Sequence, residues 1–379
     1  MQLLSDSELV QLVRSVFPVL PNDEYLTILV DIPNNPQNDF QDWKKRRHMA
    51  YDWYTKLNAN TQALNLQGVR LCAYASVDSN NADLPRFGYI YDKAVPNISN
   101  ELLGDKWRFE TIFNNTQLFL APTQFSTTAP LKVAAKRYAF RAATMPGFSE
   151  KMIPALRIDY EKVNERCQKM KEKLDAATGA YVKFKTKENE YDIFFDLRFR
   201  LGHASGGRFP QPGTAGNLPS GETYIVPYEG EKGQVSKTEG DLPVQFENEI
   251  VVFEIRNNRA VGVRSSGLHS QNQAEYLQRE PAYGNMAELG FGILSDFGLE
   301  PIGQILLDEK LGFHIAFGRS DHFGGAVGPG NFSSAKEVVH IDRIYIPQTQ
   351  STIRIQHIDL EFETGKERIM EEDNYLIFS

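Results

Sequence analysis

Two compact apolar runs separated by a helical pattern constrain the fold of this 379-residue chain more than any other feature. The runs are YLTILVDIP at 25–33 and VRLCAYASV at 69–77, and the segment between them carries aromatic residues at helical spacing. Strand, helix and strand in that order indicate a βαβ unit with a parallel sheet. The alternation continues to about residue 177, so we expect an N-terminal α/β domain with a mostly parallel sheet over residues 1–190. Ser5 and Glu8 have the spacing of a capping box and predict a helix start.

From about residue 181 the pattern changes to short β runs. Two strand candidates lead into a loop rich in glycine and proline at 202–221, and further apolar runs follow. These runs are TYIVP, EIVVFEIRNNRAVGV, GFHIAFG, VVHIDRIYIP and TIRIQHIDLEF. They predict a β-rich C-terminal domain over 191–379, so the fold class we expect is α/β plus α+β. Two domains also suit the length, because single cores stop growing near ~250–300 residues.

The charge balance limits which kinds of partner the chain can be expected to bind. Lysine and arginine number 41 against 49 aspartates and glutamates, which gives a net charge of -8. Nucleic acids and anionic membranes attract concentrated basic surfaces, so we expect neither as a partner. The nearest basic cluster, Lys44 to Arg47, is interpreted as the solvated face of a helix rather than an RNA-binding patch.

The cysteines and the N-terminus indicate a cytoplasmic protein. Cys72 and Cys167 lie in apolar or amphipathic patterns, so buried or semi-buried free thiols are expected rather than a disulfide framework or a thiolate metal cluster. The first residues show no basic region followed by an apolar run, as a secretory signal would. The sequence contains no run of about eighteen apolar residues that would cross a membrane.

His340 and Asp342 interrupt the apolar run VVHIDRIYIP two residues apart. Because side chains alternate along a strand, both point to the same side. Burying two such groups costs free energy unless a partner satisfies them. A hydrogen bond, a salt bridge or a metal ion would each do so, and a neutral imidazole oriented by its carboxylate is one such pair.

Further carboxylates and a histidine lie beside other short strands and next to glycines. They are Glu222 in NLPSGE, Glu288 in NMAELGFG, and Glu309 and His314 in DEKLGFHIAFG. Three of them also have a structural explanation. Glu222 can accept hydrogen bonds from loop amides, Glu288 can pair with an arginine such as Arg319 or Arg343, and His314 can be a core histidine donating to a main-chain carbonyl.

Taken together, these residues favour a metal site. Carboxylates and imidazoles without thiolates suit zinc, cobalt or manganese. More carboxylates than one ion needs indicate two ions in a bridged site.

Four ordered motifs resemble the thermophilic-aminopeptidase family, which comprises metallopeptidases of the aminopeptidase T and aminopeptidase S type. The motifs are NLPSGE at 217–222, AELG at 287–290, DEKLGFHIAFG at 308–318 and HID at 340–342. The resemblance extends from about residue 140 onward and is weaker in the N-terminal part.

The resemblance implies a dinuclear metallo-aminopeptidase that removes N-terminal residues from peptides with a water activated by two metal ions. It implies two divalent ions per chain (zinc, cobalt or manganese), a peptide substrate with a free N-terminus, and a homodimer. Glu222 is the candidate general base as well as a ligand. The implied metal ligands are Glu222, Glu288, Glu309, His314, His340 and Asp342.

One position departs from the family pattern. The family has a tyrosine, thought to assist catalysis, seven residues after the histidine of its HIA motif, where this chain has Asp321 followed by His322. We predict that Asp321, His322 or Tyr345 takes over its role. The alternative is a non-catalytic or altered-substrate metal-binding member of the same fold.

Overall fold

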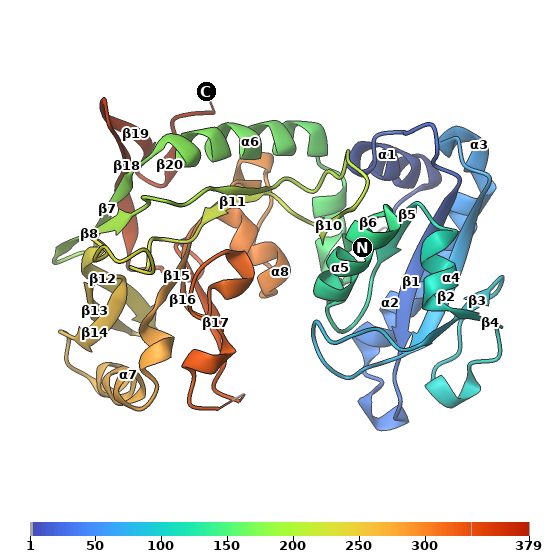
Figure 1. Cartoon of the computed structure of the whole chain (residues 1–379), viewed down its shortest axis with the longest axis horizontal. Helices are drawn as coiled ribbons and strands as arrows, with labels where there is room; N and C mark the ends of the chain where they lie inside the picture. Colours follow the sequence, from blue (N-terminus) through green and yellow to red (C-terminus); the bar gives the residue numbers. More distant parts are fainter. Residues whose placement is uncertain (1–2, 335, 379) are drawn as a thin grey trace. The chain divides into compact units, whose positions relative to one another are not determined.

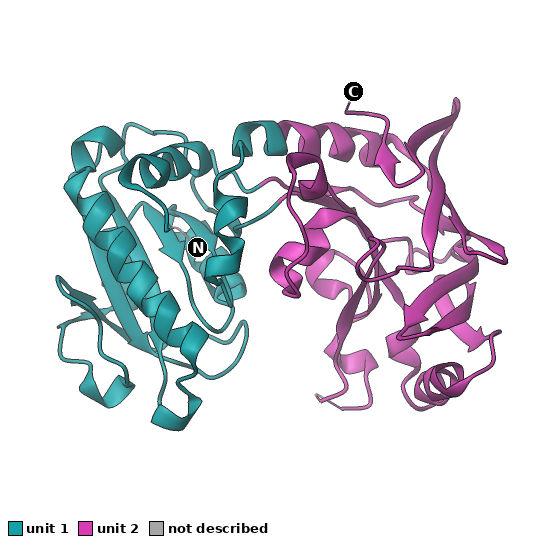
Figure 2. Cartoon of the chain, turned by 180° about the vertical axis from the view of Figure 1, so that it is seen from behind, with its two compact units in different colours: residues 1–164, 207–220 teal, residues 165–206, 221–379 magenta. Residues whose placement is uncertain are grey.

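The computed structural model describes residues 3–334 and 336–378, which form two compact units (Figures 1 and 2). Unit 1 comprises residues 1–164 and 207–220, and unit 2 comprises residues 165–206 and 221–379. The chain therefore enters unit 2 through helix α6 (Tyr160–Ala176), returns to unit 1, and then enters unit 2 again. The returning segment is most of the predicted loop rich in glycine and proline.

Unit 1 contains a seven-stranded sheet of order β10-β6-β5-β1-β2-β3-β4. The first five strands of this order are parallel, and β3 and β4 are antiparallel at one edge. The predicted α/β domain with a mostly parallel sheet is confirmed. The strands are β1 (Tyr25–Ile32), β2 (Gly68–Ala75), β3 (Phe87–Tyr91), β4 (Asp105–Arg108), β5 (Leu118–Ala121), β6 (Arg141–Thr144) and β10 (Thr214–Asn217).

The helices of unit 1 begin where the sequence signals them. Ser5 accepts a hydrogen bond from the Glu8 amide and Glu8 accepts one from the Ser5 amide, so the predicted capping box starts the first helix. The second helix buries Trp43 and Trp53. The helices are α1 (Asp6–Val16), α2 (Gln41–Ala59), α3 (Thr61–Leu64), α4 (Phe109–Asn114) and α5 (Thr128–Tyr138).

The basic cluster on α2 is only half solvated, so its interpretation as a solvated face was wrong for two of its residues. Lys44 and Lys45 are exposed, whereas Arg46 and Arg47 are buried. Arg46 Nε donates to the Phe148 carbonyl at 2.6 Å, and Arg47 donates to both carboxylate oxygens of Asp39 at 2.9 Å. A planar guanidinium can be buried here because fixed acceptors meet its donors.

Unit 2 contains two antiparallel sheets. The five-stranded sheet has the order β17-β16-β15-β11-β9 and the eight-stranded sheet the order β14-β13-β12-β8-β7-β18-β19-β20. The division expected at residue 190 falls within the eight-stranded sheet, because β7 pairs with β8 and β18. The strands are β7 (Gly179–Lys185), β8 (Glu190–Asp196), β9 (His203–Ser205), β11 (Glu222–Ile225), β12 (Glu239–Phe246), β13 (Glu249–Arg256), β14 (Arg259–Val263), β15 (Met286–Gly292), β16 (Phe313–Gly318), β17 (His340–Ile344), β18 (Arg354–Phe362), β19 (Gly365–Glu371) and β20 (Asn374–Tyr375).

One hydrophobic core joins the two sheets of unit 2. Phe253 of β13 packs on Phe317 of β16 with ring centroids 5.1 Å apart, and Phe184 of β7 packs on Tyr345, just after β17, at 4.8 Å. The few helices of the unit are short apart from α6 and α7 (Leu268–Arg279), and α8 spans Ile305–Asp308. The predicted β-rich C-terminal region is confirmed.

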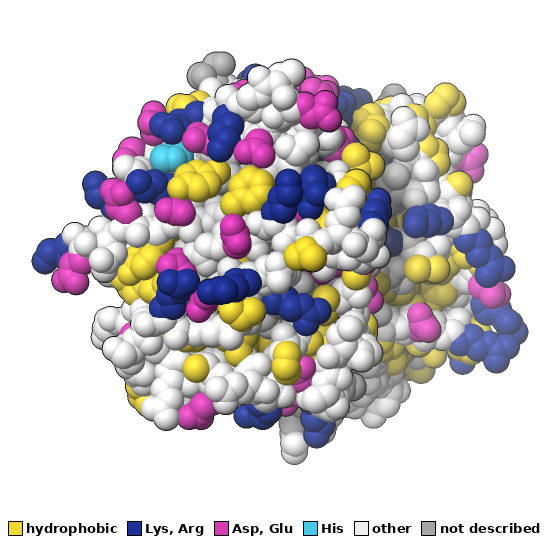
Figure 3. All heavy atoms as spheres, turned by 60° about the vertical axis from the view of Figure 1, so that its left-hand side comes forward, with side chains coloured by type: hydrophobic (Ala, Val, Ile, Leu, Met, Phe, Trp, Pro, Cys, Tyr) yellow, Lys and Arg dark blue, Asp and Glu magenta, His cyan; other side chains and the backbone are white. Residues whose placement is uncertain are grey.

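The side of the molecule shown in Figure 3 carries positive and negative side chains interspersed. Ion pairs on the eight-stranded sheet have this alternating pattern, among them Lys183–Glu190 at 2.7 Å and Arg368–Asp359 at 2.8 Å. Cys72 and Cys167 are both free and buried, as expected. Within the described residues, we find no helix that is both long enough and apolar enough to cross a bilayer.

Arg141 holds the returning segment 207–220 against the rest of unit 1. It is buried, and its guanidinium donates to the Pro18 carbonyl at 2.8 Å, the Phe209 carbonyl at 3.0 Å and the Asp23 carboxylate at 2.6 Å. Replacing it by methionine leaves Asp23 buried and unpaired, so we expect Arg141→Met to lower the free energy of unfolding of unit 1 by about 3–5 kcal/mol.

Tryptophan fluorescence during urea unfolding measures this change, because all three tryptophans lie in unit 1. Arg137→Met, at an exposed position of α5, is the control and should stay near the wild-type midpoint. Equal midpoints for the two variants would contradict the anchoring role of Arg141.

Candidate metal centre

The five-stranded sheet places the predicted ligands on neighbouring strands. Glu222 begins β11, Glu288 lies on β15, His314 on β16, and His340 and Asp342 on β17. These strands are adjacent in the order β17-β16-β15-β11. Glu222 and Asp342, 120 positions apart in sequence, therefore lie on one sheet, and the ordered motifs reflect this strand order.

Each of these ligands lies opposite a glycine or an alanine on a neighbouring strand. Glu222 pairs with Gly292, His314 with Gly290, and His340 with Gly318. Glu288 and Asp342 both pair with Ala316, one from each side. Directly opposite residues share a face of the sheet, so the small residues leave room for the ligand side chains. The alternate positions, including Leu289, Phe291, Phe313, Ile315 and Phe317, belong to the core.

Five of the predicted ligands form two trios whose donor atoms lie within 4.8 Å of one another. One trio is Glu222, Glu288 and His314, and the other is Glu288, His340 and Asp342. Glu288 belongs to both: its Oε1 is 3.5 Å from His314 Nε2, and its Oε2 is 3.1 Å from His340 Nε2. A carboxylate shared in this way is what a bridging ligand requires.

Main-chain carbonyls orient both histidines toward the carboxylates. His314 Nδ1 is 3.2 Å from the Gly312 carbonyl and His340 Nδ1 is 2.7 Å from the Arg319 carbonyl. Each Nδ1–H then donates to its carbonyl and leaves Nε2 facing Glu288. Burial opposes a charged His314, but the hydrogen bond to Glu288 and the charges of Asp342 and Glu222 outweigh burial and raise its pKa to about 9. The centre therefore attracts positive charge, which protons or a divalent ion can supply.

Glu309, the sixth predicted ligand, lies outside both trios. It accepts a hydrogen bond from its neighbour Lys310, which also donates to Glu222 Oε1 at 2.5 Å. Lys310 is almost completely buried. Burial and the negative charges of Glu222 and Asp342 raise the pKa of Glu309 to about 7, against the opposing effect of Lys310. The sequence carries a signal for Lys310, a single cation within LLDEKLGFHIAFG, but it does not show that the side chain turns inward.

The residues considered for the role of the family tyrosine occupy different environments. Tyr345 is in the core and its hydroxyl donates to the Pro243 carbonyl at 2.9 Å, so it points away from the ligands. Asp321 pairs with Arg319, with 2.5 Å between Nε and Oδ1. The His322 ring lies 5.2 Å from that of His340, edge to face. His322 is therefore the one of the three that contacts a candidate ligand.

Tyr224 is a neighbour of the centre that sequence reasoning did not identify. It pairs in register with Gly290, in the same row as His314. Burial and then the charges of Glu288 and Glu222 raise its pKa well above the usual value. Its ring packs on Phe323 with 4.7 Å between centroids, and Phe323 in turn lies 5.4 Å from His340. A half-buried phenol beside the carboxylates can donate a hydrogen bond there.

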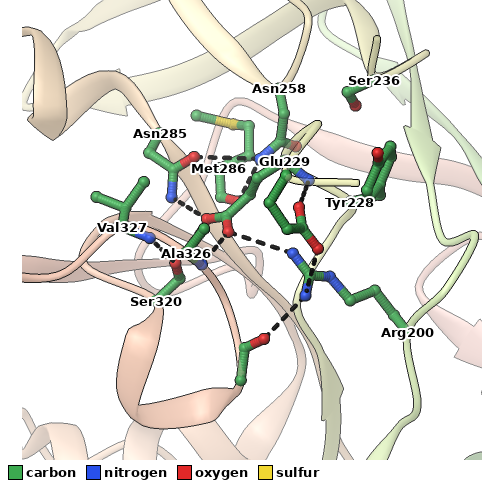
Figure 4. Close-up of polar contacts among 12 residues, drawn as sticks. Arg200, Tyr228, Glu229, Ser236, Asn258, Asn285, Met286, Ser320, Ala326 and Val327 are labelled. Carbon is green, nitrogen blue, oxygen red and sulfur yellow. Dashed lines mark hydrogen bonds and ion pairs between the residues drawn. The ribbon is translucent and has the colours of Figure 1, made fainter. Parts of the chain in front are cut away.

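A buried carboxylate outside the centre holds the loop that carries His322 (Figure 4). Glu229 accepts hydrogen bonds from Ser320 Oγ at 2.5 Å, Asn285 Nδ2 at 2.7 Å and the Ala326 amide, and pairs with Arg200 at 3.2 Å. The carboxylate of Glu229 therefore connects Asn285, the residue before β15, to Ser320 and Ala326 at the two ends of the 320–326 loop.

Two solved structures share the fold of this chain. One is the 2,5-dihydroxypyridine dioxygenase of Pseudomonas putida KT2440, with a TM-score of 0.60, 15% identity and 98% of each chain covered. The other is wild-type AmpT, aminopeptidase T, of Thermus thermophilus, with a TM-score of 0.57, 14% identity and 98% of each chain covered. No family model matches the chain, and no curated protein matches it in sequence. At these identities the similarity establishes the fold and leaves the chemistry to the site.

Gly290 gives a test of how the sheet makes room for His314. A Cβ at this position would lie 2.0 Å from His314 Nε2 and 2.3 Å from its Cε1, so the ring must move in Gly290→Ala. We expect the affinity for Mn²⁺ or Zn²⁺, measured by titration calorimetry, to fall by roughly 10- to 100-fold, as when a ligand loses its orientation. Gly262→Ala on β14, where a Cβ meets no atom within 4 Å, should bind as the wild type does. Unchanged affinity in Gly290→Ala would contradict the role of His314.

Glu229→Gln tests the anchoring of the loop. The amide loses one acceptor oxygen, so the donors of Ser320 and Ala326 compete for the one that remains. Ser320 is buried, and a buried donor left without an acceptor costs about 1–3 kcal/mol, so we expect the amides of Ala326 and Val327 to exchange hydrogen roughly 5- to 100-fold faster. Glu239→Gln, at an exposed position of β12, should leave their exchange unchanged. Equal exchange in both variants would show that Glu229 does not hold the loop.

Proposed function

We propose that the protein is a metal-dependent aminopeptidase that removes the N-terminal residue from peptides. The observation that carries the proposal is the shared position of Glu288, whose two oxygens face the Nε2 atoms of two histidines that main-chain carbonyls hold in place. The donors are carboxylates and imidazoles, which suit zinc, cobalt or manganese. The fold shared with aminopeptidase T supports the same reading.

The residues divide into ligands and proton carriers. Glu288, His340 and Asp342 would hold metal, with His314 and Glu222 as the neighbouring donors, and the metal would supply Lewis acidity and an activated water. Glu309 is the carboxylate outside the trios, and a carboxylate that is not a metal ligand can accept and return a proton. We therefore assign proton transfer to Glu309. Tyr224 and His322 flank the centre as further hydrogen-bonding groups.

Glu288→Gln tests this function. The substitution keeps the shape of the side chain and removes its charge, so both trios lose their common anion. We expect loss of bound metal and a fall in kcat/KM on aminoacyl nitroanilides of more than about 100-fold, because even outer-shell changes cost 10- to 100-fold. Assays with added cobalt, zinc or manganese measure it, and Glu239→Gln is the matched control on an exposed strand position.

The free amine of the substrate is the second readout. An aminopeptidase should leave the N-acetylated nitroanilide uncut, whereas a general hydrolase would cleave both. A metal-replete wild type with no turnover above that of Glu288→Gln would contradict the proposal.

A second candidate function is oxygenation of an aromatic ring. Glu288 faces two histidines, two histidines with one carboxylate are the ligand set of non-haem iron oxygenases, and one structural neighbour is a dihydroxypyridine dioxygenase. Oxygen uptake with Fe²⁺ and 2,5-dihydroxypyridine tests it. Peptide cleavage that proceeds equally well without oxygen would favour the aminopeptidase.

We also propose a homodimer, which rests on the resemblance to the thermophilic aminopeptidases. Sedimentation velocity at micromolar concentration measures the mass of the particle, for which the proposal requires twice 43.0 kDa.

A further inference from the structure

We propose that the ammonium group of Lys310 is a built-in cation at one end of the centre, so that the protein binds one divalent ion per chain instead of two. The ion would bind at Glu288, His340 and Asp342. This inference rests on the proposed metal centre, but it concerns the number and place of the ions rather than the reaction.

The contacts of Lys310 place its charge where a second ion would need to be. Its Nζ contacts one oxygen of Glu222 and one oxygen of Glu309, two of the six residues that the resemblance assigns to metal. The side chain is 2% exposed, so water does not screen this charge. A divalent ion between the same two carboxylates would meet the ammonium at close range in a buried site, where repulsion between like charges is strong.

The main chain holds Lys310 in this position. The 3-10 turn Glu309–Leu311 packs against the end of β15, where a Cβ on Gly292 would lie 2.4 Å from the Lys310 carbonyl carbon and 2.6 Å from its oxygen. Gly292 is also the partner of Glu222 in the β11–β15 register. Because Gly292 has no side chain, the backbone of Lys310 can approach β15 beside Glu222. The packing of the main chain thus fixes the position of Lys310.

The two trios are not equivalent in the presence of this ammonium. In the trio of Glu222, Glu288 and His314, Lys310 already pairs with Oε1 of Glu222. Only Oε2 of Glu222 faces the other members of this trio, at 3.7 Å from His314 Nε2. The other trio has no contact with Lys310: Glu288 and Asp342 lie 3.1 and 3.5 Å from His340 Nε2. The trio of Glu288, His340 and Asp342 therefore has two carboxylate charges available for a cation. The trio with Glu222 has fewer, because Lys310 already neutralises Glu222.

Metal stoichiometry tests the proposal without reference to activity. After equilibrium dialysis against Mn²⁺ and against Zn²⁺, mass spectrometry should find one ion per wild-type chain. Lys310→Met removes the ammonium and keeps the length of the side chain, so it should bind two ions. Lys366→Met, at an exposed position of β19, is the control and should bind one. Two ions in the wild type, or one ion in a folded Lys310→Met, would overturn the proposal.

A second pair of variants locates the ion even if Lys310→Met does not fold. Asp342→Asn should lose the ion, whereas Glu222→Gln should keep one ion with an affinity within roughly tenfold of wild type. The reverse pattern would overturn the proposal. One ion bound without peptide cleavage would reject the aminopeptidase and leave this inference standing, whereas a wild type that binds no ion would reject both.

Discussion

The position of Glu288 between two histidines is the interaction on which the site depends. A carboxylate buried within a sheet is costly unless charged or hydrogen-bonding groups meet both oxygens. Here each oxygen faces a different imidazole, and each imidazole is held from behind by a main-chain carbonyl. The backbone thereby fixes the histidines, the histidines fix the carboxylate, and the whole set is directed at a cation. No surface loop is needed to align these groups.

The same strands build the core and the site, one on each face of the sheet. Phenylalanines, leucine and isoleucine on one face of β15 and β16 pack toward the eight-stranded sheet, and glycine or alanine separates the ligands on the other. Because the side-chain period is two, a register slip of one residue would send ligands into the core and core residues to the site. Packing of the core therefore also maintains the geometry of the ligands.

The sequence predicted the candidate ligands, as a group that meets in space, better than it predicted the residues around them. Periodicity placed His340 and Asp342 on one side of a strand, and ordered motifs joined them to Glu222, Glu288 and His314, all of which the structure brings together. Lys310, Tyr224 and Glu229 were missed, because their importance comes from tertiary contacts that leave no local pattern. The burial of Arg46 and Arg47 was missed for the same reason. The return of the chain to unit 1 was also not predicted, since a strand of four residues in a loop rich in glycine gives little periodic signal.

An aminopeptidase and a dioxygenase share this fold, so the fold alone does not determine the reaction. A few side chains at the site must determine it. A centre with two ions needs two unopposed sets of negative charge, and Lys310 opposes one of them. A buried ammonium on a short turn is a fixed charge that does not exchange with solvent ions, so it alters the centre permanently. The position after β16, where the resembling family has tyrosine, instead carries an ion-paired aspartate and a histidine that packs on a ligand. Lys310 and the residues after β16 both lie next to the candidate ligands, where they can influence the chemistry of the centre.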